Sequence, residues 1–263
     1  MNLSSQKQIL KILFLLFVTL WLIAFFQKDK LPNKDQMLSS QLQEPFQSET
    51  SMEPFSVRVK GETYKINPVF NYELYGLVVS DHLSSSWIDI SHEKAKDYLN
   101  VEDLCVVYGE NISSGIYSSL KFSSGDWTCY VNWTGSMQQQ IQESQQFKGH
   151  YLSNNHILTE DPVLVKRILS TNKGDQIYFK GYLVNYTNER VWNSFYRKSS
   201  TTRDDVGGTA CEVIYATDFQ ILKKANVFWR FIYTFSKWMI VVLIFLFLAI
   251  SYYEAGKLLE TNP

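Results

Sequence analysis

The stretch FWRFIYTFSKWMIVVLIFLFLAISYY, residues 228–253, decides the architecture of this chain. Its centre carries no charge, while Arg230 and Lys237 lie near its start, where long basic side chains reach toward lipid headgroups. Aromatic residues gather at both ends, as in the interfacial belts of membrane helices. A buried core helix is the alternative, but such helices rarely have so long a stretch without charge. We therefore predict a transmembrane helix over residues 228–253.

A second apolar run, ILKILFLLFVTLWLIAFF, covers residues 9–26 and contains one charged residue, Lys11. Eighteen helical residues extend roughly 27 Å, close to the hydrocarbon thickness of a bilayer. A cleaved signal peptide is the main alternative, but the run ends in the letters FFQK rather than in the small residues of a cleavage site. We expect an uncleaved transmembrane helix here.

The two apolar runs divide the rest of the chain into tails, a linker and a domain. Residues 1–8 and 254–263 form short tails. Residues 27–54 are rich in Gln, Ser, Glu and Pro, so they have too little apolar surface to offset the entropy of ordering, and we expect a flexible linker. Residues 55–222 have the length of a single domain, and we expect one soluble domain there.

The domain is expected to be rich in strands, with two or three helices. Apolar or alternating stretches predict strands at residues 55–59, 72–80, 104–108, 176–186 and 211–219. Ser136 is placed to cap one helix, and Asp161 followed by Pro162 is placed to cap another. Gly181 interrupts a strand and predicts a β-bulge. We expect an α+β fold with a small bent sheet or a partly closed barrel.

Two resemblances add to this expectation. The segment GDQIYFKGYLV, residues 174–184, is similar to a strand pattern of OB-fold proteins, which implies an OB-like barrel. A broader pattern resembles a family of bacterial, mainly proteobacterial, membrane-anchored proteins with no assigned activity. It comprises LCVVYGENISSGIY (104–117), DWTCY (126–130), LSNNH (152–156), GDQI (174–177) and STTRDDVGGTACE (200–212). The chain departs from this pattern at Tyr108, where the family has tryptophan. The resemblance implies a bacterial envelope setting and no particular chemistry.

Two arguments about the side of the membrane on which the domain lies conflict with each other. The count of Lys and Arg around the two apolar runs favours a cytoplasmic domain. A short basic N-terminus before an apolar run instead resembles an export signal, and long loops are translocated largely regardless of charge. We favour a two-pass protein of the bacterial inner membrane, with a periplasmic domain and cytoplasmic termini.

The charge of the domain argues against nucleic acid as a partner. Between Val57 and Gln220 there are 15 Lys and Arg against 19 Asp and Glu, a net charge of −4. Nucleic-acid binding usually requires a basic face that displaces counterions from phosphates. The expected partners are the lipid bilayer and another membrane or envelope protein.

Three cysteines, Cys105, Cys129 and Cys211, lie in or beside predicted strands. They lack C-x-x-C spacing, so the sequence predicts neither a redox motif nor a zinc site. We expect a disulfide between Cys105 and Cys129 in an oxidising compartment, which would contribute roughly 3 kcal/mol. The alternative is three buried free thiols. A catalytic cysteine working with His156 is a further, less favoured alternative.

The candidate site residues are polar side chains in two segments. Asn154, Asn155 and His156 bring two amides and an imidazole together, which suits ligand binding or general base chemistry. Arg203 is a candidate for binding an anionic group, and Asp205 is a candidate partner for His156. The alternative is that these side chains cap turns and strand ends. The other histidines show no ligand spacing, so the sequence predicts no metal and no cofactor.

Two main functions fit the sequence. The favoured one is a module that binds or assembles with an envelope partner. The sequence shows no pairing of a nucleophile with a base, no phosphate-binding loop and no spacing typical of metal ligands. The alternative is a membrane-tethered hydrolase that uses His156 with Arg203 or Asp205. A weaker alternative is nucleic-acid or oligosaccharide binding on an OB-like surface.

Overall fold

The computed structural model describes residues 3–86, 89–125, 127–188, 190–191, 196–204 and 210–261. The chain forms two compact units. One unit contains residues 1–30 and 226–263, and the other contains residues 31–225. The fold is α+β, with a large mixed sheet in the second unit.

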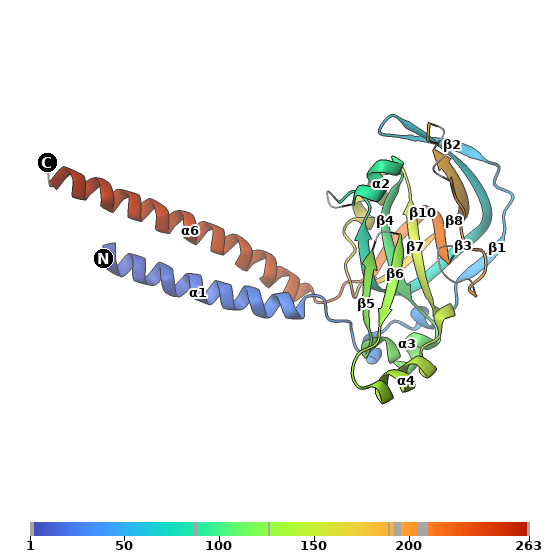
Figure 1. Ribbon diagram of the computed structural model, residues 1–263, viewed down its shortest axis with the longest axis horizontal. Coiled ribbons are helices and arrows are strands. Elements are labelled where there is room, and N and C mark those ends of the chain that lie inside the picture. Colours follow the sequence, from blue (N-terminus) through green and yellow to red (C-terminus); the bar gives the residue numbers. More distant parts are fainter. Residues whose placement is uncertain are drawn as a thin grey trace. The chain divides into compact units, whose positions relative to one another are not determined.

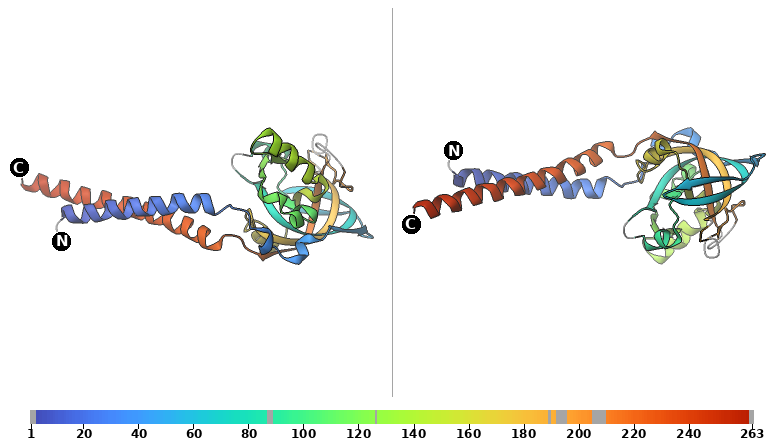
Figure 2. Two further views of the ribbon diagram at one scale, coloured as in Figure 1. Left: turned by 90° about the horizontal axis from the view of Figure 1, so that it is seen from below. Right: turned by 90° about the horizontal axis from the view of Figure 1, so that it is seen from above.

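The first unit is a pair of long helices, α1 (Leu3–Gln27) and α6 (Val227–Thr261), which lie side by side with both chain ends at the same end of the pair (Figure 1, Figure 2). Aromatic side chains pack between them, with the ring centroids of Trp21 and Tyr233 5.7 Å apart. Residues 5–27 and 227–257 are long and apolar enough to cross a membrane. The two predicted spans, residues 9–26 and 228–253, lie within these helices.

The second unit is built on an eight-stranded sheet that is antiparallel except for one pair. Its strands are β1 (Phe46–Glu49), β2 (Phe55–Val59), β3 (Glu62–Leu83), β4 (Asn100–Val107), β7 (Leu152–Leu158), β8 (Gln176–Asn188), β9 (Tyr196–Arg197) and β10 (Cys211–Lys223). The strands β7 and β10 run parallel. The 22-residue strand β3 curves across the domain, pairing with β8 through residues 64–77 and with β4 through residues 77–83 (Figure 1). Strand pairing therefore runs from β3 through β4, β7, β10 and β8 back to β3.

A two-stranded hairpin and short helices complete the domain. The hairpin consists of β5 (Lys121–Gly125) and β6 (Thr128–Asn132), and a disulfide between Cys105 and Cys129 joins β6 to β4. This is the cysteine pair expected from the sequence. The α-helices in the described part of this domain are α2 (Ile90–Ala95), α3 (Glu110–Ser114), α4 (Met137–Gln146) and α5 (Pro162–Ile168), with 3₁₀ turns η1 (Lys34–Gln36), η2 (Ser39–Leu42), η3 (Ile116–Ser118) and η4 (Gly149–Tyr151).

The two predicted helix caps are confirmed. The Asp161 side chain accepts a hydrogen bond from the Val163 amide at 2.7 Å, with Pro162 as the first helical residue of α5. The Ser136 side chain accepts a hydrogen bond from the Gln139 amide at the start of α4. The Asp161 cap fixes the residue at which α5 begins. The buried Ile168 of α5 then packs within the main apolar cluster of the sheet.

Residues 27–54 do not form the flexible linker that the sequence predicts, because most of them belong to the folded domain. Strand β1 pairs with β3, and Gln41 in η2 is fully buried. The Leu38 amide donates to Gln176 Oε1 at 2.8 Å. Backbone and side-chain hydrogen bonds hold this polar segment, so its low content of apolar residues did not reveal that it is ordered.

The predicted bulge is also corrected. Gly181 pairs in register with Tyr72 of β3 and Ala216 of β10, while the register shift lies in β10 between Ala216 and Asp218. A Cβ atom added to Gly181 would lie 2.0 Å from the carbonyl oxygen of Tyr215. The glycine is therefore required for the close approach of two strands.

Candidate thiol site

The candidate site lies on one face of three neighbouring strands, β4, β7 and β10. Asp103 pairs in register with His156, and Cys211 pairs in register with Asn154. Side chains alternate between the two faces of a strand, so Asn154 and His156 share one face and Asn155 points to the other. The register of three strands thus brings Asp103, His156 and Cys211 together from distant parts of the sequence.

Asp103 and His156 form a buried pair. His156 Nδ1 lies 2.5 Å from Asp103 Oδ1, and the Asn100 amide donates to the same oxygen at 2.7 Å. His156 is fully buried, and burial alone would lower the pKa of its imidazole, but the Asp103 carboxylate raises this pKa to about 9. Burial likewise acts to raise the pKa of Asp103, but the charge and hydrogen bond of His156 lower it overall. The two residues therefore stabilise each other as an ion pair.

Cys211 is the free cysteine of the chain and is 8% exposed. Asn154 Nδ2 lies 3.4 Å from its sulfur, and the thiol donates to the Trp127 carbonyl at 3.5 Å. Burial would raise the pKa of the thiol, but a hydrogen bond and the charge of His156, together with Asn154 and Arg197, lower the pKa below its ordinary value. A thiol beside cationic groups is the environment in which cysteines become nucleophilic.

Arg197 and Trp127 complete the surroundings of His156. Arg197 Nη2 lies 3.0 Å from His156 Nε2, and the Arg197 guanidinium carbon lies 4.1 Å from the centroid of the Trp127 ring. The buried Arg197 Nη1 has no hydrogen-bond partner among the described residues. The guanidinium can donate to Nε2 only when the imidazole is neutral, so beside the imidazolium it acts as a second nearby cation.

A cleft of about 480 Å³ opens beside the thiol. Cys211, Asn154 and Glu212 lie along the sheet side of the cleft. Other lining residues come from the β6 strand and from the segment that precedes β10, and they include Thr128, Cys129, Ser200, Thr202 and Arg203. A molecule in the cleft would therefore lie beside Cys211.

The structure places the predicted site residues in different surroundings. His156 and Asn154 lie on the face that carries Cys211. Asn155 is buried on the opposite face and donates to the Leu104 carbonyl at 3.1 Å, so it is not a cleft residue. Arg203 lines the cleft, but it binds Glu44 at 2.7 Å and the Pro45 carbonyl at 2.8 Å, so a partner from the domain already occupies its guanidinium. Asp205 lies outside the described residues.

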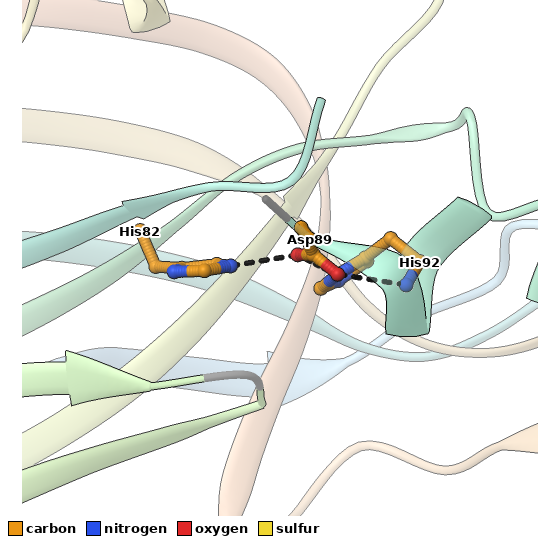
Figure 3. A group of neighbouring side chains, drawn as sticks. All are labelled: His82, Asp89 and His92. Atoms are coloured by element: carbon orange, nitrogen blue, oxygen red, sulfur yellow. Dashed lines mark hydrogen bonds and ion pairs between the residues drawn. The ribbon is translucent and has the colours of Figure 1, made fainter. Parts of the chain in front are cut away.

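A second polar cluster, His82, Asp89 and His92, lies at the end of β3 and the start of α2 (Figure 3). His82 Nε2 lies 2.7 Å from Asp89 Oδ2, and His92 Nδ1 contacts the same oxygen. Burial lowers the pKa of His92, although Asp103 and Asp89 oppose this effect. Asn100 Nδ2 lies 3.1 Å from His92 Nε2 and also binds Asp103, so hydrogen bonds connect this cluster with His156.

Sequence patterns gave little indication of Asp103, Arg197, Trp127 or the His82 cluster. The one available signal was Cys211, which remains unpaired once Cys105 and Cys129 are joined. An imidazole held by a carboxylate and lying on the same sheet face as a cysteine can stabilise a thiolate and transfer a proton. No protein-family model, curated protein or solved structure matches this chain.

Proposed function

We propose that this chain is a membrane-anchored enzyme that uses Cys211 as a thiolate nucleophile in acyl transfer or hydrolysis. The observation that carries this proposal is the placement of Asp103, His156 and Cys211 on one face of β4, β7 and β10, with Cys211 in the lining of the cleft. Catalytic thiols are commonly activated by a base that a third group orients. Here Asp103 is the orienting group and His156 is the base.

The proposed reaction begins when the Cys211 sulfur attacks the carbonyl carbon of an ester, thioester or amide in the cleft. The Asn154 amide, which lines the cleft, is the candidate donor to the developing oxyanion. The bond to the leaving group then breaks, and His156 supplies the proton that this group takes. Water, or an acceptor alcohol or amine, then attacks the thioester carbon and gives its proton to His156, and the carbon–sulfur bond breaks to release the acyl group and restore the thiolate.

We also propose that α1 and α6 anchor this domain on the periplasmic side of a bacterial inner membrane. Two spans place both termini on one side and the domain on the other. The Cys105–Cys129 disulfide supports an oxidising compartment, since disulfides persist in the periplasm and are rare in the cytosol.

An OB-like, partly closed barrel is the fold that the strand pairing supports best. Pairing returns from β8 to β3, the strands β7 and β10 are parallel, and α5 lies between β7 and β8 along the chain. OB folds bind ligands on the face of their second and third strands, which correspond here to β4 and β7. Asp103, Asn154 and His156 lie on these two strands, which by analogy supports a ligand site there.

A binding module that engages an envelope partner is the second candidate. It is favoured by the contact of Arg197 Nη2 with His156 Nε2, because this cation lies at the ring nitrogen that would exchange a proton with Cys211. Under this alternative the cleft holds its ligand without turnover.

Reaction with p-nitrophenyl acetate distinguishes the two candidates. We expect the full-length protein in detergent to release p-nitrophenolate and to carry an acetyl group on Cys211, as seen by intact mass. The His156→Gln variant should be acylated at least about 100-fold more slowly, since general acid and base catalysis contributes about 10²–10⁴-fold. His150→Gln is the matched control, because His150 also lines the cleft but lies outside the line of proton transfer. Equal acylation of the wild type and of a folded His156→Gln variant would contradict the enzyme proposal.

A further inference from the structure

We propose that His82, Asp89 and His92 form a binding site for a divalent transition-metal ion of the zinc type. The three side chains converge from the end of β3 and the first turn of α2 (Figure 3). One ligand atom from each residue lies within 4.8 Å of the others. Two imidazole nitrogens and one carboxylate oxygen are a ligand set that Zn²⁺ takes in catalytic sites, where a fourth position stays open.

The local fold holds these ligands in place. Asp89 is the N-cap of α2, and its Oδ1 accepts the His92 backbone amide at 2.9 Å, so its carboxylate is fixed relative to the helix. The His92 ring stacks on Trp127 with centroids 3.5 Å apart. Asp89 and His92 are almost fully buried, whereas the His82 side chain is 18% exposed. The cluster is therefore rigid, and its exposed side provides a path for an ion.

An adjoining cavity supplies the second, independent observation. It has a volume of about 180 Å³, and its lining includes Asp89, His92 and three further buried oxygen-bearing side chains. Ser84 Oγ, Asp97 Oδ1 and Asn100 Oδ1 have no hydrogen-bond partner among the described residues. Buried polar atoms in native proteins nearly always have a partner. Three unpartnered oxygens beside a set of metal ligands point to a cation, bound directly or through water.

The charge around the cavity agrees with a cation. Asp89, Glu93 and Asp97 contribute carboxyl groups to the lining, while Lys60 is the basic residue, apart from His92, among the described residues that line it. In the hydrogen-bonded arrangement His82 Nε2 is 2.7 Å from Asp89 Oδ2. Around a tetrahedral zinc ion with bonds of about 2.0–2.2 Å the ligand atoms are about 3.3 Å apart. These two ligand atoms need to separate by less than about 1 Å to admit the ion, which replaces the hydrogen-bonding protons.

Zinc titration of the tag-free, chelator-treated full-length protein tests this site. Calorimetry should show one Zn²⁺ per chain, and Co²⁺ should give visible absorption bands of a low-symmetry site. His82→Gln and Asp89→Asn should each weaken Zn²⁺ binding at least tenfold. Loss of a residue that only hydrogen-bonds to a metal ligand typically weakens binding about 10- to 100-fold, and loss of a ligand should weaken it at least as much. These two variants are preferred because His92 packs on Trp127, so its substitution could unfold the domain.

Two matched variants make the outcome decisive. His150→Gln removes a histidine outside the cluster, and Cys211→Ser removes the thiol beside His156, and both should retain wild-type affinity. The metal-free melting temperature shows that each variant is folded. Absence of Zn²⁺ binding at micromolar concentrations, or unchanged affinity in His82→Gln and Asp89→Asn, would overturn the proposal. Loss of binding in Cys211→Ser would also overturn it, because the ion would then lie at the thiol.

Discussion

Replacing Asp103 by Asn should reverse the protonation of His156 at neutral pH. The change keeps the size of the side chain and removes the charge that raises the pKa of His156 to about 9 against the effect of burial. Burial and Arg197 remain, and both lower this pKa, so the imidazole of the variant should titrate below its ordinary value of 6.5. The rise from 6.5 to about 9 corresponds to roughly 3 kcal/mol of stabilisation of the imidazolium.

The pH dependence of stability follows from the sign of this change. A histidine with a raised pKa in the folded state stabilises the fold fully below pH 6.5, and this contribution is lost as the pH rises toward 9. The melting temperature of the wild type should therefore fall across this range by more than that of Asp103→Asn. At pH 6 the variant should be the less stable protein, because it has lost the ion pair.

NMR titration of the histidine ring signals in detergent measures the pKa directly, and His156→Gln identifies the resonance. Alkylation of Cys211 by iodoacetamide at pH 7 should also be slower in Asp103→Asn, because the neutral imidazole no longer stabilises the thiolate. Glu102→Gln is the control: Glu102 neighbours Asp103 on the opposite face of β4, and burial raises its pKa to about 9, so it is already neutral. A His156 signal that titrates below pH 7 in the wild type would refute the reasoning.

Three further predictions concern the fold and its setting. Gly181→Ala should destabilise the domain by roughly 2–3 kcal/mol, because the new Cβ meets the Tyr215 carbonyl. A Cβ at Gly149 would meet no atom within 4 Å, so Gly149→Ala is the control, and comparison of the two melting curves checks the prediction. Removing the disulfide with Cys105→Ser and Cys129→Ser should cost roughly 3 kcal/mol, because the bond closes a loop over a separation of 24 residues; a melting temperature equal to that of the wild type would contradict this. In a Cys211→Ser background, the exposed Ser51→Cys should react with an impermeant maleimide in intact spheroplasts. Labelling that requires lysis would place the domain in the cytoplasm.

Helices and most strands could be predicted because their signals come from residues close together in the sequence. The pairing of distant strands leaves no such signal. The start of α5 could be predicted from Asp161 and Pro162, because capping acts between residues that are close in sequence. Strand β1 was missed because an edge strand is held by backbone hydrogen bonds to β3, which any sequence can form. The meeting of Asp103 with His156 depends on strand register across 53 residues, and no spacing in the sequence encodes it.

The charges around His156 provide a physical reason for Cys211 to lie where it does. Asp103 balances the imidazolium, which leaves Arg197 as a second cation in the same buried region. A buried charge without a counter-charge is costly, so the Cys211 thiolate is favoured as the compensating anion. Asp97 is the competing anion, because burial raises its pKa to about 7 while Arg197 opposes this rise. Below pH 7 Asp97 is neutral and the thiolate is the main partner of the cations. Alkylation of Cys211 should therefore be faster above pH 7 in an Asp97→Asn variant, which never carries the competing charge, than in the wild type, and the two rates should converge below pH 7.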